Sequence, residues 1–278
     1  GTAEELAQAA IAEVRRIERT YSRYRADSIV SRINAAAGRY RVECDDETWQ
    51  LLAYADHLYG ASGGLFDITS GVLRRAWDFR QPRVPGPDEL APLLALVDWA
   101  AVRREDGAIF LPRAGMEIDF GGFGKEYAAD RACALLQQRG VRHGYVNLGG
   151  DMRFIGPQPD GRPWSIGIQD PRKPDGTVAS IAVSQGALTT SGDYERCFDL
   201  DGKRYCHVLN PRTGMAVSHW RSVSVLAPLA ALGGSVSTIA MLKEADALAF
   251  LGASGLAYFA IDSSGNAHHH SISGDYAS

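Results

Sequence analysis

A histidine at the end of a predicted strand is the residue most suited to catalysis. The run Tyr205-Cys-His-Val-Leu209 has strand composition and is broken by Asn210-Pro211. Catalytic side chains are often mounted where a rigid strand gives way to a loop. Because imidazole titrates near neutral pH, His207 is predicted to take or give a proton.

One glycine-rich segment has the composition of an anion-binding turn. Gly121-Gly-Phe-Gly124 joins a predicted strand, Met116–Phe120, to a predicted helix that begins near Lys125. Glycines let a backbone approach a phosphate, and a helix N-terminus offers N–H groups and positive charge. Asp119 could accept from a hydroxyl or an adenine amine. A turn that simply needs glycine is the alternative, and the segment lacks the G-x-G-x-x-G spacing of a nicotinamide site.

Two further segments have a similar composition. One carries Gly149 and Gly150, within Asn147–Asp151, and the other carries Ser191 and Gly192, within Thr189–Tyr194. A single segment of this kind is ordinary turn chemistry. Three in one chain indicate a long ligand with a polyphosphate that is held at several points.

An aromatic segment could hold a flat ring. Leu65-Phe-Asp-Ile-Thr69 places an aromatic ring beside a carboxylate, and Trp77 follows closely. Such a mixture suits a heteroaromatic ligand. Core packing of Trp77 is an equally open interpretation.

Four cysteines without metal-type spacing are present. If Asp201-Gly202 is a two-residue hairpin turn, Cys197 lies opposite Cys206. A cross-strand disulfide and a pair of half-buried thiols are then both open.

Composition excludes several classes of function. The net charge is -4 and basic residues form no run, so a nucleic-acid partner is not expected. No apolar stretch reaches the roughly 20 residues that a membrane span needs. The chain opens directly before a helix, and because leaders are removed from exported proteins, the compartment stays open.

The elements that position these residues alternate between helices and antiparallel hairpins. A capping box, Thr2-Ala-Glu-Glu5, opens a long helix that should end near Arg25–Ser28. Gly265–His270 is expected to be a solvated terminus. The sequence predicts one α+β domain over residues 1–278. Further helices are expected over 46–62, 125–139 and 235–251, a proline-rich loop over 78–88, and strands over 108–111, 116–120, 144–148, 164–169, 180–184, 197–200, 205–209, 222–227 and 257–262.

Six segments, in this order, resemble the ApbE family, the FAD:protein FMN transferases. They are Tyr24–Asn34, Gly64–Thr69, Ile118–Lys125, Asn147–Asp151, Thr190–Tyr194 and His207–Gly214. The resemblance implies an α+β fold related to the T-fold, with antiparallel sheets and several long helices. It also implies Mg²⁺-dependent transfer of FMN from FAD to a Thr or Ser of a partner protein, with release of AMP.

The resemblance also implies roles for single residues. His207 would be the catalytic histidine, and the Mg²⁺ ligands would be the Gly122 carbonyl, the Ser237 carbonyl and Thr238. An exported or periplasmic location, with or without a membrane anchor outside this chain, is expected. The implied FAD contacts are Tyr24, Leu65, Phe66, Asp67, Asp119, Lys125 and Val217.

Two positions depart from the family pattern. Relatives usually carry an aspartate where this chain has Gly234, so the charged ligand of the metal is missing from its expected place. Ser235, a water molecule or Glu126 could substitute, and relatives often have glycine at the position of Glu126. A helix N-terminal carboxylate favoured by the dipole is the plainer interpretation of Glu126. Asn210, where relatives commonly have Asp, should keep the turn hydrogen bonds and lose the charge.

These departures leave three functions open. The first is the flavin transferase. The second is a catalytically weak FAD- or FMN-binding protein that serves as a flavin carrier or redox partner in maturation of a respiratory complex. The third is a Mg²⁺-dependent pyrophosphatase that cleaves FAD with water.

Overall fold

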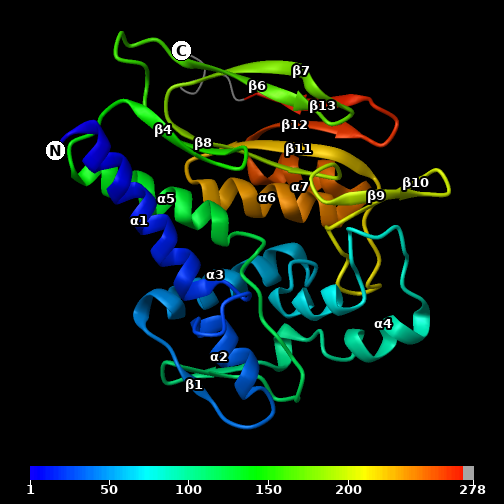
Figure 1. Ribbon diagram of the computed structural model, residues 1–278. Coiled ribbons are helices and arrows are strands. Elements are labelled where there is room, and N and C mark those ends of the chain that lie inside the picture. Colours follow the sequence, from blue (N-terminus) through cyan, green and yellow to red (C-terminus); the bar gives the residue numbers. More distant parts are fainter. Residues whose placement is uncertain (272–278) are drawn as a thin grey trace. The chain divides into compact units, whose positions relative to one another are not determined.

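Six strands build an antiparallel sheet in which small side chains gather on one face of β8. The computed structural model describes residues 1–271, and the strand order is β13-β12-β11-β8-β5-β4 (Figure 1). The bounds are β4 Gly144–Leu148, β5 Asp151–Gly156, β8 Gly186–Gly192, β11 Trp220–Ala227, β12 Ala257–Asp262 and β13 Ala267–His270.

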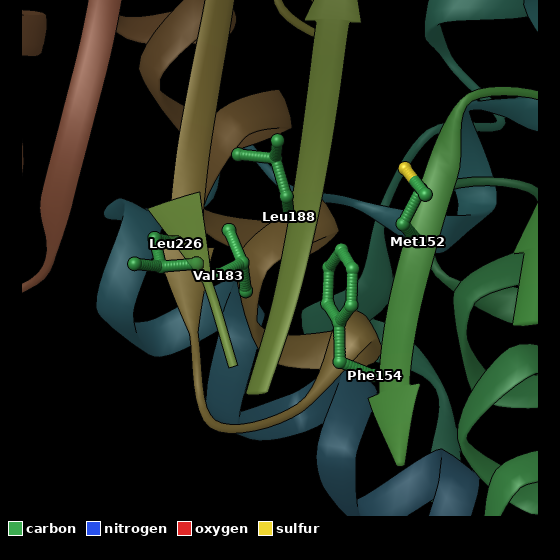
Figure 2. Packing of buried hydrophobic residues seen from close by; sticks show 5 residues of the cluster. All are labelled: Met152, Phe154, Val183, Leu188 and Leu226. Carbon is green, nitrogen blue, oxygen red and sulfur yellow. The ribbon is translucent and has the colours of Figure 1, made fainter. Parts of the chain in front are cut away.

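The two faces of this sheet are covered by different elements. On one face, Ala187 of β8 packs with Ala129 and Ala230, so that α5 (Gly124–Gln138) and α6 (Ala230–Lys243) approach the sheet closely. The opposite face is covered by the hairpin of β6 (Trp164–Asp170) and β7 (Lys173–Val183). Figure 2 shows the apolar cluster beneath that hairpin, which consists of Met152, Phe154, Val183, Leu188 and Leu226.

Alternation along β8 positions part of the candidate site. Successive side chains of a strand point to opposite faces, so Thr189 and Ser191 share the helix-covered face with Ala187, whereas Leu188 faces the hairpin. A Cβ added at Gly233 of α6 would lie 2.5 Å from Thr189 Oγ1. The small residues therefore let α6 lie directly on β8.

The chain forms two compact units. The sheet, α5, α6, α7 (Ala247–Ser254) and the β6–β7 hairpin belong to unit 1, which comprises Gly1–Ile17, Phe123–Glu195 and the stretch from Ser218. Unit 2 comprises Glu18–Gly122 and Arg196–Val217. Helix α1 (Ala3–Tyr21) contributes residues to both. The single domain expected over residues 1–278 stays a prediction.

Unit 2 is built from helices and two small sheets. Its α-helices are α2 (Ile29–Ala36), α3 (Asp46–Ser62) and α4 (Pro87–Leu94). The 3₁₀ segments are Ile68–Arg75 and Trp99–Ala101, with a third, Glu244–Asp246, in unit 1. One sheet has the order β1-β3-β2 and the other is the β9–β10 hairpin. The strand bounds are β1 Val42–Glu43, β2 Arg103–Glu105, β3 Ala108–Phe110, β9 Cys197–Leu200 and β10 Lys203–Cys206.

Many predicted elements are confirmed. The capping box forms, with the Thr2 backbone N–H donating to Glu5 at 2.8 Å and the Glu5 N–H to Thr2 Oγ1 at 3.2 Å. Helix α3 is capped by Asp45 and ends at left-handed Gly63. The α+β class is confirmed, and no helix within residues 1–271 has the length and apolar character of a membrane span.

Two strand predictions are wrong because other groups take the backbone hydrogen bonds. Residues 116–120 form no strand. The Ile118 N–H donates to Asn34 Oδ1 at 2.7 Å, and the Asp119 N–H to the Ile68 carbonyl at 2.9 Å. The strand expected to reach Leu209 ends at Cys206, so His207 lies just beyond β10.

Helix ends and the C-terminal segment also differ from expectation. The first helix ends at Tyr21 and a separate α2 follows. The helix expected over 235–251 is split at Glu244, whose φ is +47° and whose carbonyl accepts Trp220 Nε1–H at 2.7 Å. Residues 267–270 form edge strand β13 by pairing with β12, although Ala267, His269 and His270 are exposed to solvent as expected.

Candidate active site

In unit 1, the start of α5 is joined to the sheet by an ion pair. Lys125 Nζ contacts Asp151 Oδ2 and donates to the Leu148 carbonyl at 3.2 Å. Asp151 is buried, and its Oδ1 accepts the Thr190 N–H at 2.9 Å. Burial opposes the charge of Lys125, but the carboxylates of Asp151 and Glu126 hold its pKa above the ordinary value. Three predicted segments, far apart in sequence, therefore meet here.

The turn between β4 and β5, beside Lys125, requires the glycine pair Gly149 and Gly150. Gly149 and Gly150 have φ of +62° and +93°, a region that L-residues rarely adopt. They connect β4 directly to β5, and Asn147 Oδ1 accepts the Gly150 N–H at 2.9 Å. A two-residue hairpin of this kind requires glycine whatever it binds. Its exposed backbone stands next to a cation, since a Cβ at Gly149 would lie 4.0 Å from Lys125 Nζ.

Three hydroxyl groups lie together where β8 meets α6. Ser191 Oγ is 2.8 Å from Ser237 Oγ and 3.0 Å from Thr238 Oγ1. Ser237 also donates to the Gly234 carbonyl at 3.0 Å. Ser191 was predicted in a loop, but it belongs to β8 and points to the helix-covered face. Ser237 and Thr238, the two predicted metal ligands of α6, therefore lie next to Ser191, which was predicted to contact the phosphates of the ligand.

Glu126 of α5 is buried, and its side chain lies against Gly234 of α6. Its side chain is 9% exposed, and its Oε1 is 3.6 Å from Lys125 Nζ. Burial, with the nearby Asp151 carboxylate, raises the pKa of Glu126 to about 8. Its Oε2 is buried and has no hydrogen-bond partner. Sequence reasoning had left Glu126 as one of three substitutes for the missing carboxylate.

In unit 2, Asp119 is surrounded by positive charge. Its Oδ2 contacts the Arg74 guanidinium and lies 3.5 Å from Arg23 Nη1. Its Oδ1 accepts the Gly121 N–H at 2.9 Å. Sequence reasoning missed both arginines, because no local spacing links them to an aspartate 45 and 96 positions away.

The glycine before α5 allows a close aromatic contact within unit 2. A Cβ at Gly122 would lie 2.6 Å from Phe66 Cζ, so any side chain there would displace this buried ring. Tyr24, by contrast, is 75% exposed, with the Arg23 guanidinium 5.3 Å from the centre of its ring. Leu65 is half-buried.

Asp67 acts as an internal cap. Its Oδ1 accepts the Thr69 N–H at 2.7 Å and the Thr69 hydroxyl at 2.5 Å, while Oδ2 accepts the Trp99 N–H at 3.1 Å. Burial raises the pKa of Asp67, although these donors oppose the shift. Asp67 also lines a pocket of about 360 Å³ with Tyr59 and Arg212.

The loop after His207 is held by hydrogen bonds on both sides. The His207 N–H donates to the Arg196 carbonyl at 3.0 Å, and the Val217 N–H to the Val208 carbonyl at 3.0 Å. Asn210 Oδ1 accepts the Arg212 N–H at 2.9 Å. Asn210 therefore keeps the turn hydrogen bonds, as predicted.

Trp77 anchors this loop rather than standing open to a ligand. It is buried, its Nε1–H donates to the Gly214 carbonyl at 2.8 Å, and it stacks on Phe79 at 5.4 Å between centroids. The core-packing interpretation of Trp77 is the one that the geometry supports.

The two hairpin cysteines face each other. Cys206 pairs with Cys197 in the β9–β10 register, and Asp201-Gly202 is the two-residue turn, as predicted. The N–H···O bond at His207 and Arg196 makes the adjacent cysteine pair a non-hydrogen-bonded one, where side chains are closest. Both are thiols in the structure, and a disulfide between them stays a prediction.

The structure thus gathers the predicted residues into groups within each unit. The group in unit 1 consists of Lys125, Gly149, Gly150, Ser191, Ser237 and Thr238. Gly192 follows Ser191 on β8, where a Cβ would lie 2.3 Å from the Tyr194 ring. In unit 2 are Tyr24, Leu65, Phe66, Asp67, Asp119, Gly122, His207 and Val217. Their roles toward FAD and a metal stay predictions.

Comparison with known proteins identifies related chains. The model of the ApbE family matches residues 2–260. An FAD:protein FMN transferase of Klebsiella pneumoniae is 33% identical over 76% of this chain, and one of Treponema pallidum is 33% identical over 76%. These matches span 66% and 64% of the relatives, so the chain covers just under two thirds of their length.

Solved structures match over most of the chain. The ApbE protein of Thermotoga maritima has a TM-score of 0.90 at 31% identity, covering 97% of this chain and 90% of that one. The flavin transferase ApbE of Vibrio cholerae has a TM-score of 0.87 at 26% identity, covering 98% and 90%.

Proposed function

Since the chain belongs to the ApbE family, we propose that it is an FAD:protein FMN transferase. It moves the FMN part of FAD onto a Thr or Ser hydroxyl of an acceptor protein and releases AMP. The observation that carries the proposal is a connected set of contacts in unit 1, in which Lys125 contacts Asp151, Asp151 accepts the Thr190 N–H, and the neighbouring Ser191 contacts Thr238. A cation, glycine backbone and hydroxyl groups together suit a pyrophosphate.

The reaction is a displacement at phosphorus. The acceptor hydroxyl oxygen forms a bond to the phosphorus of the FMN phosphate, and the bond from that phosphorus to the bridging oxygen breaks. AMP leaves with the bridging oxygen. The imidazole of His207 accepts the proton of the hydroxyl, because imidazole is a base that can take up a proton near neutral pH. Lys125 is the cation that would orient the phosphates.

The residues present fit a hard divalent cation such as Mg²⁺. Ser237 and Thr238 offer hydroxyl oxygens, and Oε2 of Glu126, which has no hydrogen-bond partner, would offer a charged one on loss of the carboxyl proton to a bound cation. Mg²⁺ prefers oxygen ligands and keeps water and substrate phosphates, so it needs few protein carboxylates. Within residues 1–271, no group of three His, Cys, Asp or Glu side chains forms a metal cluster. When bound, Mg²⁺ would neutralise charge on the pyrophosphate.

The family resemblance also supports an exported, periplasmic location, with or without a lipid anchor. Fractionation of producing cells, followed by immunoblotting of periplasm and membranes, tests this proposal.

The activity is tested by incubating the protein with FAD, Mg²⁺ and an acceptor domain that bears a target Thr. Covalent flavin on the acceptor, detected by in-gel fluorescence and by mass spectrometry, is the expected result. Release of FMN and AMP without labelled acceptor would instead identify a pyrophosphatase. Retention of FAD with neither product would identify a flavin-binding protein.

A further inference from the structure

Two residues on neighbouring helices compete for one space. Gly234 is buried in α6, and a Cβ added there would lie 2.7 Å from Glu126 Cγ, 3.1 Å from Cδ and 3.3 Å from Oε1. The side chain of Glu126, on α5, therefore fills the volume that a Cβ at position 234 would occupy. Glycine at position 234 on α6 therefore makes room for the side chain of Glu126 on α5.

The Glu126 carboxyl group has an oxygen without a partner. Glu126 is 7% exposed, and its Oε2 makes no hydrogen bond. Its other oxygen lies 3.6 Å from Lys125 Nζ, and that ammonium group is already engaged with Asp151 and the Leu148 carbonyl. Burial without a donor disfavours the charged form of this carboxyl group, and a bound cation would supply the positive charge that stabilises it.

The atoms near Gly234 are oxygens of the type that a hard cation takes. Ser237 and Thr238 follow Gly234 by about one helical turn, and their hydroxyls lie within 3.0 Å of Ser191 Oγ. These oxygens are neutral. A carboxylate directed at Gly234 adds the charge that they lack, and one or two carboxylates with phosphate and water are the usual surroundings of Mg²⁺.

We propose that Glu126 of α5 is the carboxylate ligand of the divalent cation in this chain, in place of the aspartate that the family resemblance implies at the position of Gly234 on α6. The proposal rests on the proposed function for the identity of the cation. The proposal explains the residues at 126 and 234 together, because the carboxylate of the site is supplied by α5 instead of by α6.

A helix-dipole role for Glu126 makes a different prediction. A carboxylate in the first turn of α5 stabilises the helix by its charge alone. Such a role needs no glycine at position 234, leaves metal affinity unchanged when Glu126 is neutralised, and gains nothing from an aspartate on α6.

The test is Mn²⁺ binding to the full chain, measured from the EPR signal of free Mn²⁺, with and without FAD. Glu126→Gln should weaken Mn²⁺ binding roughly tenfold or more, because it removes the charged ligand and keeps the shape. Glu4→Gln is the matched control, since Glu4 is an exposed carboxylate in the first turn of α1. It should leave Mn²⁺ affinity unchanged.

A swap variant keeps the test decisive if Glu126→Gln folds poorly. The double variant Glu126→Gly, Gly234→Asp should restore Mn²⁺ affinity to within about threefold of the parent, because the carboxylate returns to α6 and the space is free. Gly234→Asp alone should bind no better than the parent and melt at a lower temperature, because two carboxyl groups then compete for the same volume.

Metal binding and flavin transfer separate the two proposals. Unchanged Mn²⁺ affinity in Glu126→Gln, failure of the double variant to bind, or no Mn²⁺ binding by the parent would overturn the assignment of Glu126. Glu126-dependent Mn²⁺ binding without any flavin transfer would support the assignment and overturn the transferase.

Discussion

The roles of Glu126 and Gly234 can be understood only together, because the side chain of Glu126 packs against Gly234. Taken singly, Gly234 is a lost carboxylate and Glu126 is a first-turn acid. In the structure, the Glu126 carboxyl group occupies the space above Gly234. The site therefore keeps a carboxylate although the expected position has none.

This contact makes a stability prediction for Gly234→Ala. Replacing glycine by alanine inside a helix ordinarily stabilises it by up to about 1 kcal/mol. At position 234 the added Cβ meets Glu126 Cγ at 2.7 Å, and overpacking of a buried site costs about 1–3 kcal/mol. We expect a net loss of stability in urea denaturation of the metal-free protein.

Two controls accompany this measurement. Gly252, in α7, has no atom within 4 Å of an added Cβ, so Gly252→Ala should stabilise the protein. In a Glu126→Ala background, Gly234→Ala should lose its cost, since its neighbour is gone. Equal effects of Gly234→Ala in both backgrounds would show that the two side chains do not share the space.

At the scale of elements, α6 begins without a cap of its own. Leu229 occupies the N-cap and offers no side-chain acceptor. Asp130 of α5 takes this role, since its two oxygens accept the N–H groups of Ala230 and Ala231 at 2.9 Å each. Arg153 Nε lies 3.0 Å from Asp130 Oδ1 as an ion pair without hydrogen-bond geometry. One helix thus fixes the start of the next.

Removal of this cap should be costly. Asp130→Ala leaves two helix N–H groups without their acceptor and removes the ion-pair partner of Arg153, whose Nη1 keeps its bonds to the Phe154 and Gly186 carbonyls. The change is expected to lower the free energy of unfolding by about 2–4 kcal/mol. Amide hydrogen exchange of α6 should accelerate, including at Ser237 and Thr238. The matched control is Asp88→Ala in the first turn of α4, where Asp88 is exposed. A loss no larger than that of the control would contradict this account of α6.

For the whole chain, sequence patterns predicted local helices and turns better than they predicted contacts between residues distant in the sequence. The helix expected over 46–62 is observed as α3, and the β9–β10 hairpin follows from Asp201-Gly202. The central position of β8 and the break at Glu244 were missed, because both depend on partners distant in sequence. The same limit hid Arg23 and Arg74 beside Asp119, whereas the six motifs identified the family because their order was preserved.

The last prediction concerns ligand binding and the stability of the whole chain. A ligand that binds only the folded state raises its stability by about 2.7 kcal/mol at a concentration of 100 times Kd. FAD should therefore raise the melting temperature of the parent. His207→Ala should keep this FAD-dependent shift and lose covalent transfer, because the imidazole is proposed to move a proton rather than to hold the flavin. His57→Ala, which changes an exposed histidine of α3, should keep both. If His207→Ala loses the FAD shift as well, His207 is a ligand contact or a structural residue, and another group must accept the proton.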